Sequence, residues 1–544
     1  MKILLTSVFQ PFAVDNKFTR KEMPMDLLRS QIMSFQDIFV PFINYSSYGL
    51  HLIANNITDR EITVLDFPTE EKFVREIKEN IYEYIGVSFI QPNFLKAKHM
   101  CELIKLHSPL SKIILGGAGA LIPNLKEITN ADYICVGDGV SFMQELLEIR
   151  NIKFKHPDVY SYNPVIFGKK IKRKLAYLIS NSLGCDNNCD FCMTSSFFGK
   201  KISLMKDNEI KDYILYLNRE KKADKILFVG DENLFQNNKN ILNILTECQN
   251  QAESFIEFSV FSAFDEIMKN SIFDITRSGI SLIWIGVESK YSTYQKNIID
   301  ELPKLVERVL EAGISTITSM LLCHDNHTKQ NIFEDIEWAY SLNSPYYQYM
   351  LYLPLIGTRL FKKMRAEKRI FDSIPLEERH GLKQLTHYHP EFTPLESEKI
   401  REYAYKTEYE RFGPSMIRNL AVKINGYNYS KKISSDPLHN KRRKKIYSEI
   451  KKYLPFALAC SKLAQFEQHK KNIENVIAES VKIAGPPTLK DWMFSKYIIF
   501  KGKRHRKFLN DGYSLQPEIQ KTVYYNQSVI FSDSEETQAV KKYV

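Results

Sequence analysis

The chain has 544 residues, which is too many for one hydrophobic core and suggests two to four domains. Hydrophobic residues make up 44% and charged residues 26%, with 21 glycines and 21 prolines, which excludes a disordered or collagen-like protein. Eight cysteines are too few for a disulfide scaffold, and the net charge of +11 leaves nucleic acid, anionic membranes and acidic substrates open as partners.

Short apolar runs alternate with amphipathic stretches over the first part of the chain. These runs predict strands at 2–9, 61–67, 84–90, 112–117 and 131–137. Continuous Val, Ile and Leu runs of this kind are typical of parallel strands that are buried on both faces. We therefore expect a doubly wound α/β domain over 1–165, of the Rossmann-like type, with ligands at the strand ends that carry glycines.

A second alternating series begins near Lys174. Its predicted strands are 175–182, 225–232, 255–263, 281–289, 314–322 and 346–354. Six such strands with helices between them predict a partial (β/α)6 barrel, similar to a TIM barrel, over 166–365. The remaining residues, 366–544, lose this alternation and predict a mainly helical domain, with helices at 395–411, 441–465 and 470–483.

Three of the cysteines are bunched at the end of the first strand of this barrel. Cys185, Cys189 and Cys192 have the spacing C-x3-C-x2-C. Random placement would produce such a triplet about 0.002 times in a chain of this composition. A loop that leaves a strand can wrap three thiolates around one metal centre. Three ligands are one short of a closed site, so one metal position is left for a non-protein ligand, or a distant histidine completes a zinc site.

This motif, with the aromatic Phe191 before its last cysteine, resembles the signature of the radical S-adenosylmethionine (SAM) superfamily. The resemblance covers most of 174–358. It implies a 4Fe–4S cluster held by the three cysteines, with SAM on the open iron. It further implies that an electron from the cluster cleaves SAM to methionine and a 5'-deoxyadenosyl radical.

Other strand ends match the family as well. Gly230, Asp231 and Glu232 resemble the segment that accepts hydrogen bonds from the SAM amino group. Glu288 and Ser289, which follow Gly286 and Val287, resemble the element that binds the ribose hydroxyls. The stretch 353–358 resembles the loop after the sixth strand, with Ile356 where proline is common.

A doubly wound domain placed before such a barrel resembles the cobalamin-binding subclass of the superfamily. Gly116 and Gly117 fall where the resemblance places the cofactor, and glycine lets the backbone approach a large planar ligand. The cobalt-ligating motif D-x-H-x-x-G is absent. Either cobalamin binds without a histidine ligand, or the domain binds something else. The first domain's histidines are expected to be surface or hydrogen-bonded residues rather than metal ligands: His51, His99, His107 and His156.

The resemblance implies a cobalamin-dependent methyltransferase that acts on an unactivated carbon of a lipid, natural product or other small molecule. It also implies a low-potential electron donor of the flavodoxin or ferredoxin type. Two alternatives stay open. One is a radical SAM oxidoreductase or rearrangement enzyme that does not methylate, and the other is an RNA-modification protein that uses a basic C-terminal region.

The positive charge is concentrated near the C-terminus. Residues 411–510 contain 23 Lys+Arg and 6 Asp+Glu, a local net charge of +17, so the other 444 residues carry −6. The apolar and aromatic block that leads into a basic block over 492–507 predicts contact with a membrane surface, with a solvated helical face as the alternative and nucleic acid least favoured. No apolar run approaches the ~18 residues of a membrane span. We therefore expect a cytoplasmic protein, at most peripheral on a membrane.

Overall fold

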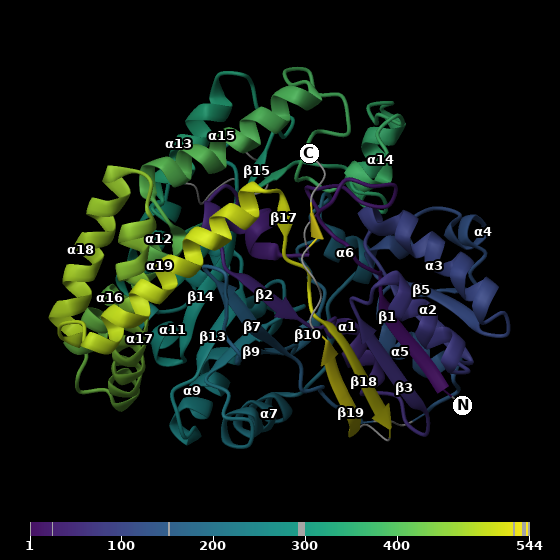
Figure 1. Cartoon of the computed structure of the whole chain (residues 1–544), viewed down its shortest axis with the longest axis horizontal. Helices are drawn as coiled ribbons and strands as arrows, with labels where there is room; N and C mark the ends of the chain where they lie inside the picture. Colours follow the sequence, from purple (N-terminus) through teal and green to yellow (C-terminus); the bar gives the residue numbers. More distant parts are fainter. Residues whose placement is uncertain are drawn as a thin grey trace.

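A computed structural model describes residues 2–23, 25–150, 153–291, 300–525, 528–535 and 540–541, the last two ranges as backbone only. Two large sheets and a layer of helices make up most of the molecule (Figure 1), with two further sheets of two strands each among the described residues. The first sheet lies at the right of the view, and the long C-terminal helices lie at the left.

The first sheet confirms the doubly wound α/β prediction. Its parallel strands follow the order β3-β1-β4-β5-β6. Helices pack on both faces, because the strands are apolar on both sides. The order reverses between β1 and β4, and ligands of such sheets bind at the strand ends beside this reversal. The strands are β1 (Lys2–Ser7), β3 (Glu61–Asp66), β4 (Tyr84–Ser88), β5 (Lys112–Gly116) and β6 (Tyr133–Ile134), and the helices beside the reversal are α1 (Tyr48–Ala54) and α5 (Gly139–Leu146).

The C-terminal segment differs from the expectation of a mainly helical end. A hairpin of β18 (Ile519–Tyr525) and β19 (Ser528–Glu535) joins the first sheet, with β18 antiparallel to β3. In β18, Thr522 and Tyr524 are buried on one face of the sheet and Ile519 is buried on the other, so the strand is partly covered on both faces. The hairpin pairs with the edge of β3 that the parallel strands leave open.

The second sheet confirms the partial barrel. The six expected strands are parallel and follow one another in space in chain order. Two antiparallel strands from the predicted first domain, β7 (Tyr160–Ile166) and β2 (Phe42–Tyr45), extend the sheet beyond its first parallel strand. The parallel strands are β9 (Lys174–Ile179), β12 (Lys225–Phe228), β13 (Glu257–Phe261), β14 (Ile280–Glu288), β15 (Ser315–Leu322) and β16 (Tyr346–Leu351).

Apolar side chains of an N-terminal segment fill part of the inside of the barrel. Ile32 and Met33, at the end of the π-helix η1 (Leu28–Ile32), pack with Val40 against Ile317 of β15. Trp284 of β14 lies beside this cluster. The two sheets are therefore interlocked, since the N-terminal η1 and β2 contribute to the barrel and the C-terminal strands β18 and β19 belong to the first sheet. The domain limits at 165 and 365 stay predictions.

Helices α15 (Pro394–Phe412), α16 (Ser415–Lys432), α17 (Pro437–Leu463), α18 (Glu467–Ala484) and α19 (Leu489–Asn510) confirm the helical C-terminal region. The basic run at 441–445 is partly used inside the protein. Arg442 is buried and donates to the carbonyls of Ala312 and Gly313, and Lys445 pairs with Asp224. None of the described helices has the length and apolar character needed to cross a membrane.

Candidate active site

The cysteine loop is anchored by a buried aspartate. The carboxylate of Asp231, at the end of the second barrel strand, accepts the backbone N–H groups of Asn181 and Ser182 at 2.7 and 2.8 Å. It also accepts the Ser182 hydroxyl at 2.5 Å. These bonds fix the chain three residues before the first cysteine.

The three predicted cysteines line one cavity of about 1020 Å³ at the strand ends of the barrel. Cys185 is buried, whereas Cys189 and Cys192 are half-buried. Burial raises the pKa of the Cys189 thiol to about 12, so a bound cation is needed to hold the thiolate form at neutral pH. Within the described part of the chain, no histidine and no further cysteine lines this cavity.

Two predicted carboxylates face the cysteines across the same cavity. Glu232 and Glu288 both line it, and burial raises the pKa of Glu288 to about 7. Glu288 has a φ of 55°, in the left-handed region, at an irregularity in the pairing of β14 with β15. Such backbone strain at a strand end is typical of a functional position.

Three predicted binding residues do not line the cavity. The side chain of Ser289 is fully buried and donates to Asp335 at 2.5 Å, and the carboxylate of Asp231 is taken up by the bonds described above. Gly230 has a φ of 82°, which favours glycine, and supports the turn into Asp231. The Asp231 and Ser289 side chains are thus already hydrogen-bonded within the protein, and direct contact of Gly230, Asp231 and Ser289 with a cofactor stays a prediction.

Sequence reasoning missed the wall inside the barrel. Phe261 and Trp284 stack with ring centroids 4.9 Å apart, and Gln348 accepts the Ser319 hydroxyl at 2.5 Å. All four residues line the cavity. They come from four successive strands, at positions that alternate with residues buried against the outer helices. This alternation was the available signal, but it does not tell which face is inside.

The loop after the sixth barrel strand joins the cavity to the first sheet. The Gln91 side chain donates to the carbonyl of Ile356 at 2.6 Å and accepts its N–H at 3.2 Å. At the start of α14 (Arg359–Ala366), the N–H of Leu360 donates to the carbonyl of Asp190 in the cysteine loop at 3.0 Å. The ends of both sheets are thus held against each other.

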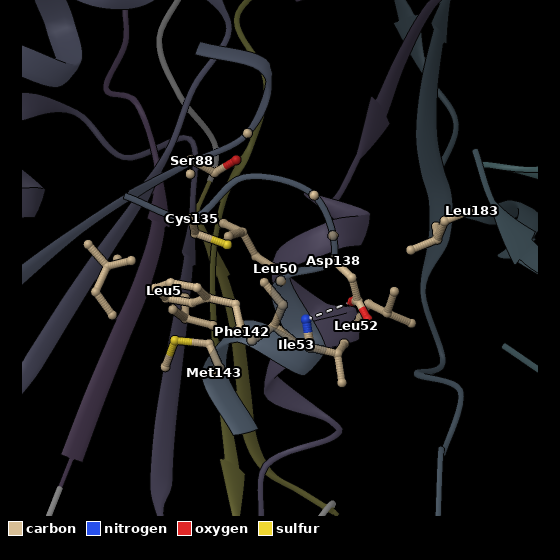
Figure 2. A pocket seen from close by; sticks show the side chains of 18 of the residues that line it. Leu5, Leu50, Leu52, Ile53, Ser88, Cys135, Asp138, Phe142, Met143 and Leu183 are labelled. Carbon is tan, nitrogen blue, oxygen red and sulfur yellow. Dashed lines mark hydrogen bonds between the residues drawn. The ribbon is translucent and has the colours of Figure 1, made fainter. Parts of the chain in front are cut away.

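A second cavity, of about 260 Å³, lies at the strand ends of the first sheet, where the strand order reverses. Its lining includes the predicted Gly116 and Gly117. Figure 2 shows Leu5, Ile53 and Phe142 among the apolar side chains around it, with the hydrogen bond of 2.9 Å from the Val140 N–H to Asp138 at its rim. The walls are mostly apolar, which suits a flat aromatic group.

The histidines of the first domain lie outside this second cavity. His51 is buried between Asp66 and Tyr524, at 2.7 Å from each. His156 donates from Nδ1 to the carbonyl of Pro157, while its Nε2 accepts the Tyr48 hydroxyl and the Ser180 N–H. Burial lowers the pKa of His156 to about 4. Both histidines are hydrogen-bonded, as expected.

A short helix separates the two cavities. Helix α6 (Met193–Phe198) follows the third cysteine directly. Cys192 and Ser195 face the cysteine cavity, whereas Phe197 and Phe198 line the cavity of the first sheet. One turn of helix therefore has a candidate site on each side.

Two family models match the chain at these places. The Radical SAM superfamily model covers 179–339, and the B12 binding domain model covers 44–147. The chain contains a radical SAM domain and a B12-binding domain. Its cofactors are a 4Fe–4S cluster, SAM and cobalamin, and it is an enzyme.

The chain is similar to two methyltransferases in sequence and to a solved structure in fold. It is 25% identical over 318 residues to bacteriochlorophyllide d C-8(2)-methyltransferase of Chlorobaculum tepidum, covering 52% of this chain and 68% of that one. It is 23% identical to an uncharacterized methyltransferase of Pyrococcus horikoshii, over 38% of this chain and 43% of that one. The structure of the radical SAM methyltransferase TsrM of Kitasatospora setae, with cobalamin and a 4Fe–4S cluster bound, shares the fold with a TM-score of 0.52 at 12% identity. That match covers 82% of this chain and 99% of TsrM.

The residues of both cavities fit these cofactors. Three thiols without a fourth protein ligand in the described lining fit a 4Fe–4S cluster with one open iron, and they do not fit a zinc site closed by histidine. In the second cavity, a Cβ on Gly117 would lie 2.6 Å from the Phe89 carbonyl and one on Gly86 would lie 2.8 Å from Leu5. The shape of the second cavity thus depends on glycine at both positions, because a Cβ at either would lie too close to its neighbour. The apolar walls of this cavity suit the aromatic base of cobalamin.

Proposed function

We propose that the protein is a cobalamin-dependent methyltransferase that acts on an unactivated carbon of a small molecule, in the class of lipids and natural products. The position of α6 is the observation that carries this proposal, since Cys192 and Ser195 face one cofactor cavity and Phe197 and Phe198 the other. The match to a bacteriochlorophyllide d methyltransferase supports the same reaction class.

In this proposal each residue has a binding or positioning task. Cys185, Cys189 and Cys192 hold the cluster, and Glu232 and Glu288 accept hydrogen bonds from SAM. When bound, the cluster supplies a low-potential electron to SAM and cobalamin supplies a methyl carrier. Asp231 fixes the cysteine loop, and the apolar lining of the second cavity keeps water from the cofactor there.

The substrate is proposed to lie against the inner wall of the barrel. The stacked rings of Phe261 and Trp284 offer an apolar surface, and Ser319 and Gln348 beside them offer hydrogen bonds. Such a wall suits a small molecule that has a flat apolar part and a polar edge. A flavodoxin or ferredoxin is the proposed electron donor.

Transfer of a labelled methyl group to cobalamin tests the proposal without knowledge of the substrate. The anaerobically reconstituted enzyme is incubated with cobalamin, a low-potential reductant and methyl-deuterated SAM, and the cobalamin is analysed by mass spectrometry. We expect trideuteromethyl-cobalamin. Formation of 5'-deoxyadenosine without any labelled cobalamin would instead support a radical SAM enzyme that does not methylate.

A further inference from the structure

The outer face of α19 exposes large apolar side chains. Leu489 is 78% exposed, Met493 65%, Phe500 56% and Trp492 46%. Leu489, Met493 and Phe500 lie on one stripe of the helix, because their spacing of four and seven residues matches the helical period. Trp492 lies beside this stripe. Isolated exposed apolar residues are ordinary, but several of them along one side of a helix mark an interaction surface.

The opposite face of α19 is firmly packed. Ser495, Ile498, Gly502 and His505 are buried on that side. A Cβ on Gly502 would lie 2.8 Å from a methyl group of Leu463, so α19 is in close contact with α17. The helix therefore has no room to rotate its apolar row inward.

Cations continue the same stripe. Helix α19 has seven Lys and Arg residues and one acid, Asp491, which accepts hydrogen bonds from Thr488 at the helix start. Arg506 pairs with Asp37 at 2.7 Å. In the described part of the chain the other six cations form no ion pair: Lys490, Lys496, Lys501, Lys503, Arg504 and Lys507.

We propose that the outer face of α19 binds the surface of an anionic lipid bilayer, with the helix lying in the plane of the interface. Apolar and aromatic side chains beside lysines are the composition of interfacial helices, whose apolar side enters the headgroup region while the cations meet lipid phosphates. This proposal is independent of the methyltransferase reaction, since it uses no residue of either cofactor cavity.

Two other occupants fit the face less well. A second copy of the chain would bring two sets of unpaired cations together, and like charges at an interface weaken association. Single-stranded nucleic acid stacks its bases on aromatic rings set among cations. In α19 five of the seven cations lie at 501–507, after the exposed rings Trp492, Tyr497 and Phe500 rather than among them.

Vesicle co-sedimentation of the full-length protein tests the proposal. The vesicles are phosphatidylglycerol with phosphatidylcholine, or phosphatidylcholine alone. We expect binding to the anionic vesicles only, weakened by 0.5 M salt. The double variant M493S/F500S should bind at least tenfold more weakly, and so should K503Q/R504Q/K507Q. The matched control is I81S/L110S, which removes two apolar side chains of the first domain that are more exposed than Met493 and Phe500, at 89% and 91%.

Every outcome decides the proposal. Absence of binding to anionic vesicles, equal binding to neutral vesicles, or a loss of binding in I81S/L110S as large as in M493S/F500S overturns it. A dimer in sedimentation equilibrium that M493S/F500S abolishes assigns the face to a second copy instead. Tight binding of a single-stranded RNA oligonucleotide without vesicle binding assigns it to nucleic acid. Thermal unfolding at the wild-type temperature shows that the variants are folded.

Discussion

The carboxylate of Asp231 accepts the Ser182 hydroxyl at 2.5 Å and the Ser182 N–H at 2.8 Å, which ties the end of one barrel strand to the start of the cysteine loop. Asp231 is fully buried, so without its carboxylate the N–H and the hydroxyl of Ser182 would each lose a buried hydrogen-bond acceptor. The shape of the cysteine loop thus depends on a residue that does not line the cysteine cavity.

Replacement of Asp231 should therefore loosen the cluster without removing a ligand. In D231A the N–H groups of Asn181 and Ser182 lose a buried acceptor, at a cost of about 1–3 kcal/mol each. We expect a lower unfolding temperature and less iron per chain after reconstitution, measured by calorimetry and elemental analysis. The exposed neighbour of the first cysteine serves as the control, and D186N should keep its iron. Wild-type iron content in D231A would refute the positioning role.

The three cysteines are expected to be individually essential for iron binding. Alanine at Cys185, Cys189 or Cys192 should abolish the 4Fe–4S absorption and the formation of 5'-deoxyadenosine from SAM. Cys248 is buried outside both cavities, and C248A should retain both properties. A variant such as C185A that still assembled a full cluster and cleaved SAM would show that the cluster lies elsewhere.

Gly116 lines the second cavity, and a side chain introduced at this position can enter the cavity without straining the backbone. A Cβ at this position would lie 3.7 Å from the nearest atom, which is an ordinary contact. We expect G116A to bind cobalamin and G116L to block the cavity, with a loss of at least tenfold in affinity measured from cobalamin absorbance after gel filtration. G116L should keep the wild-type iron content. Equal cobalamin binding by both variants would place the cofactor outside this cavity.

The buried carboxyl of Glu288 should make stability depend on pH. Its folded pKa of about 7 is raised above the unfolded value near 4.5, so the folded chain holds an extra proton between these values. The proton bound to Glu288 stabilises the folded chain at low pH. This stabilisation is lost as the pH rises towards 7, by at most about 1.4 kcal/mol in the free energy of unfolding per pH unit. Denaturation of cofactor-free protein at pH 5 and pH 8 should show a smaller decrease in E288Q than in wild type. An equal loss of stability between pH 5 and pH 8 in E288Q and wild type would show that Glu288 does not have a raised pKa in the folded chain.

Local sequence pattern predicted most of the fold. Runs such as 84–90 and 281–289 are apolar enough to be recognised as strands from a few neighbouring residues. The spacing of Cys185, Cys189 and Cys192 likewise lies within one loop. These features could be predicted because neighbouring residues decide them.

Features that depend on distant contacts could not be predicted. Nothing local in 519–525 tells that it pairs with β3, more than 450 residues away, and nothing in 28–33 tells that it closes the barrel. Asp231 and Ser289 have the residue types of a binding site, but their orientation follows from buried partners such as Asp335. Sequence likewise does not tell which cations of 441–445 face solvent, because Arg442 is buried through its contacts with Ala312 and Gly313.

The central claim is that one chain holds an iron–sulfur cluster and cobalamin in two cavities on either side of α6. The most direct test is the iron and cobalamin content of protein purified anaerobically from cobalamin-supplied cells. The account predicts about four iron atoms and about one cobalamin per chain. Protein with a full cluster that takes up no cobalamin, even on reconstitution, would contradict it.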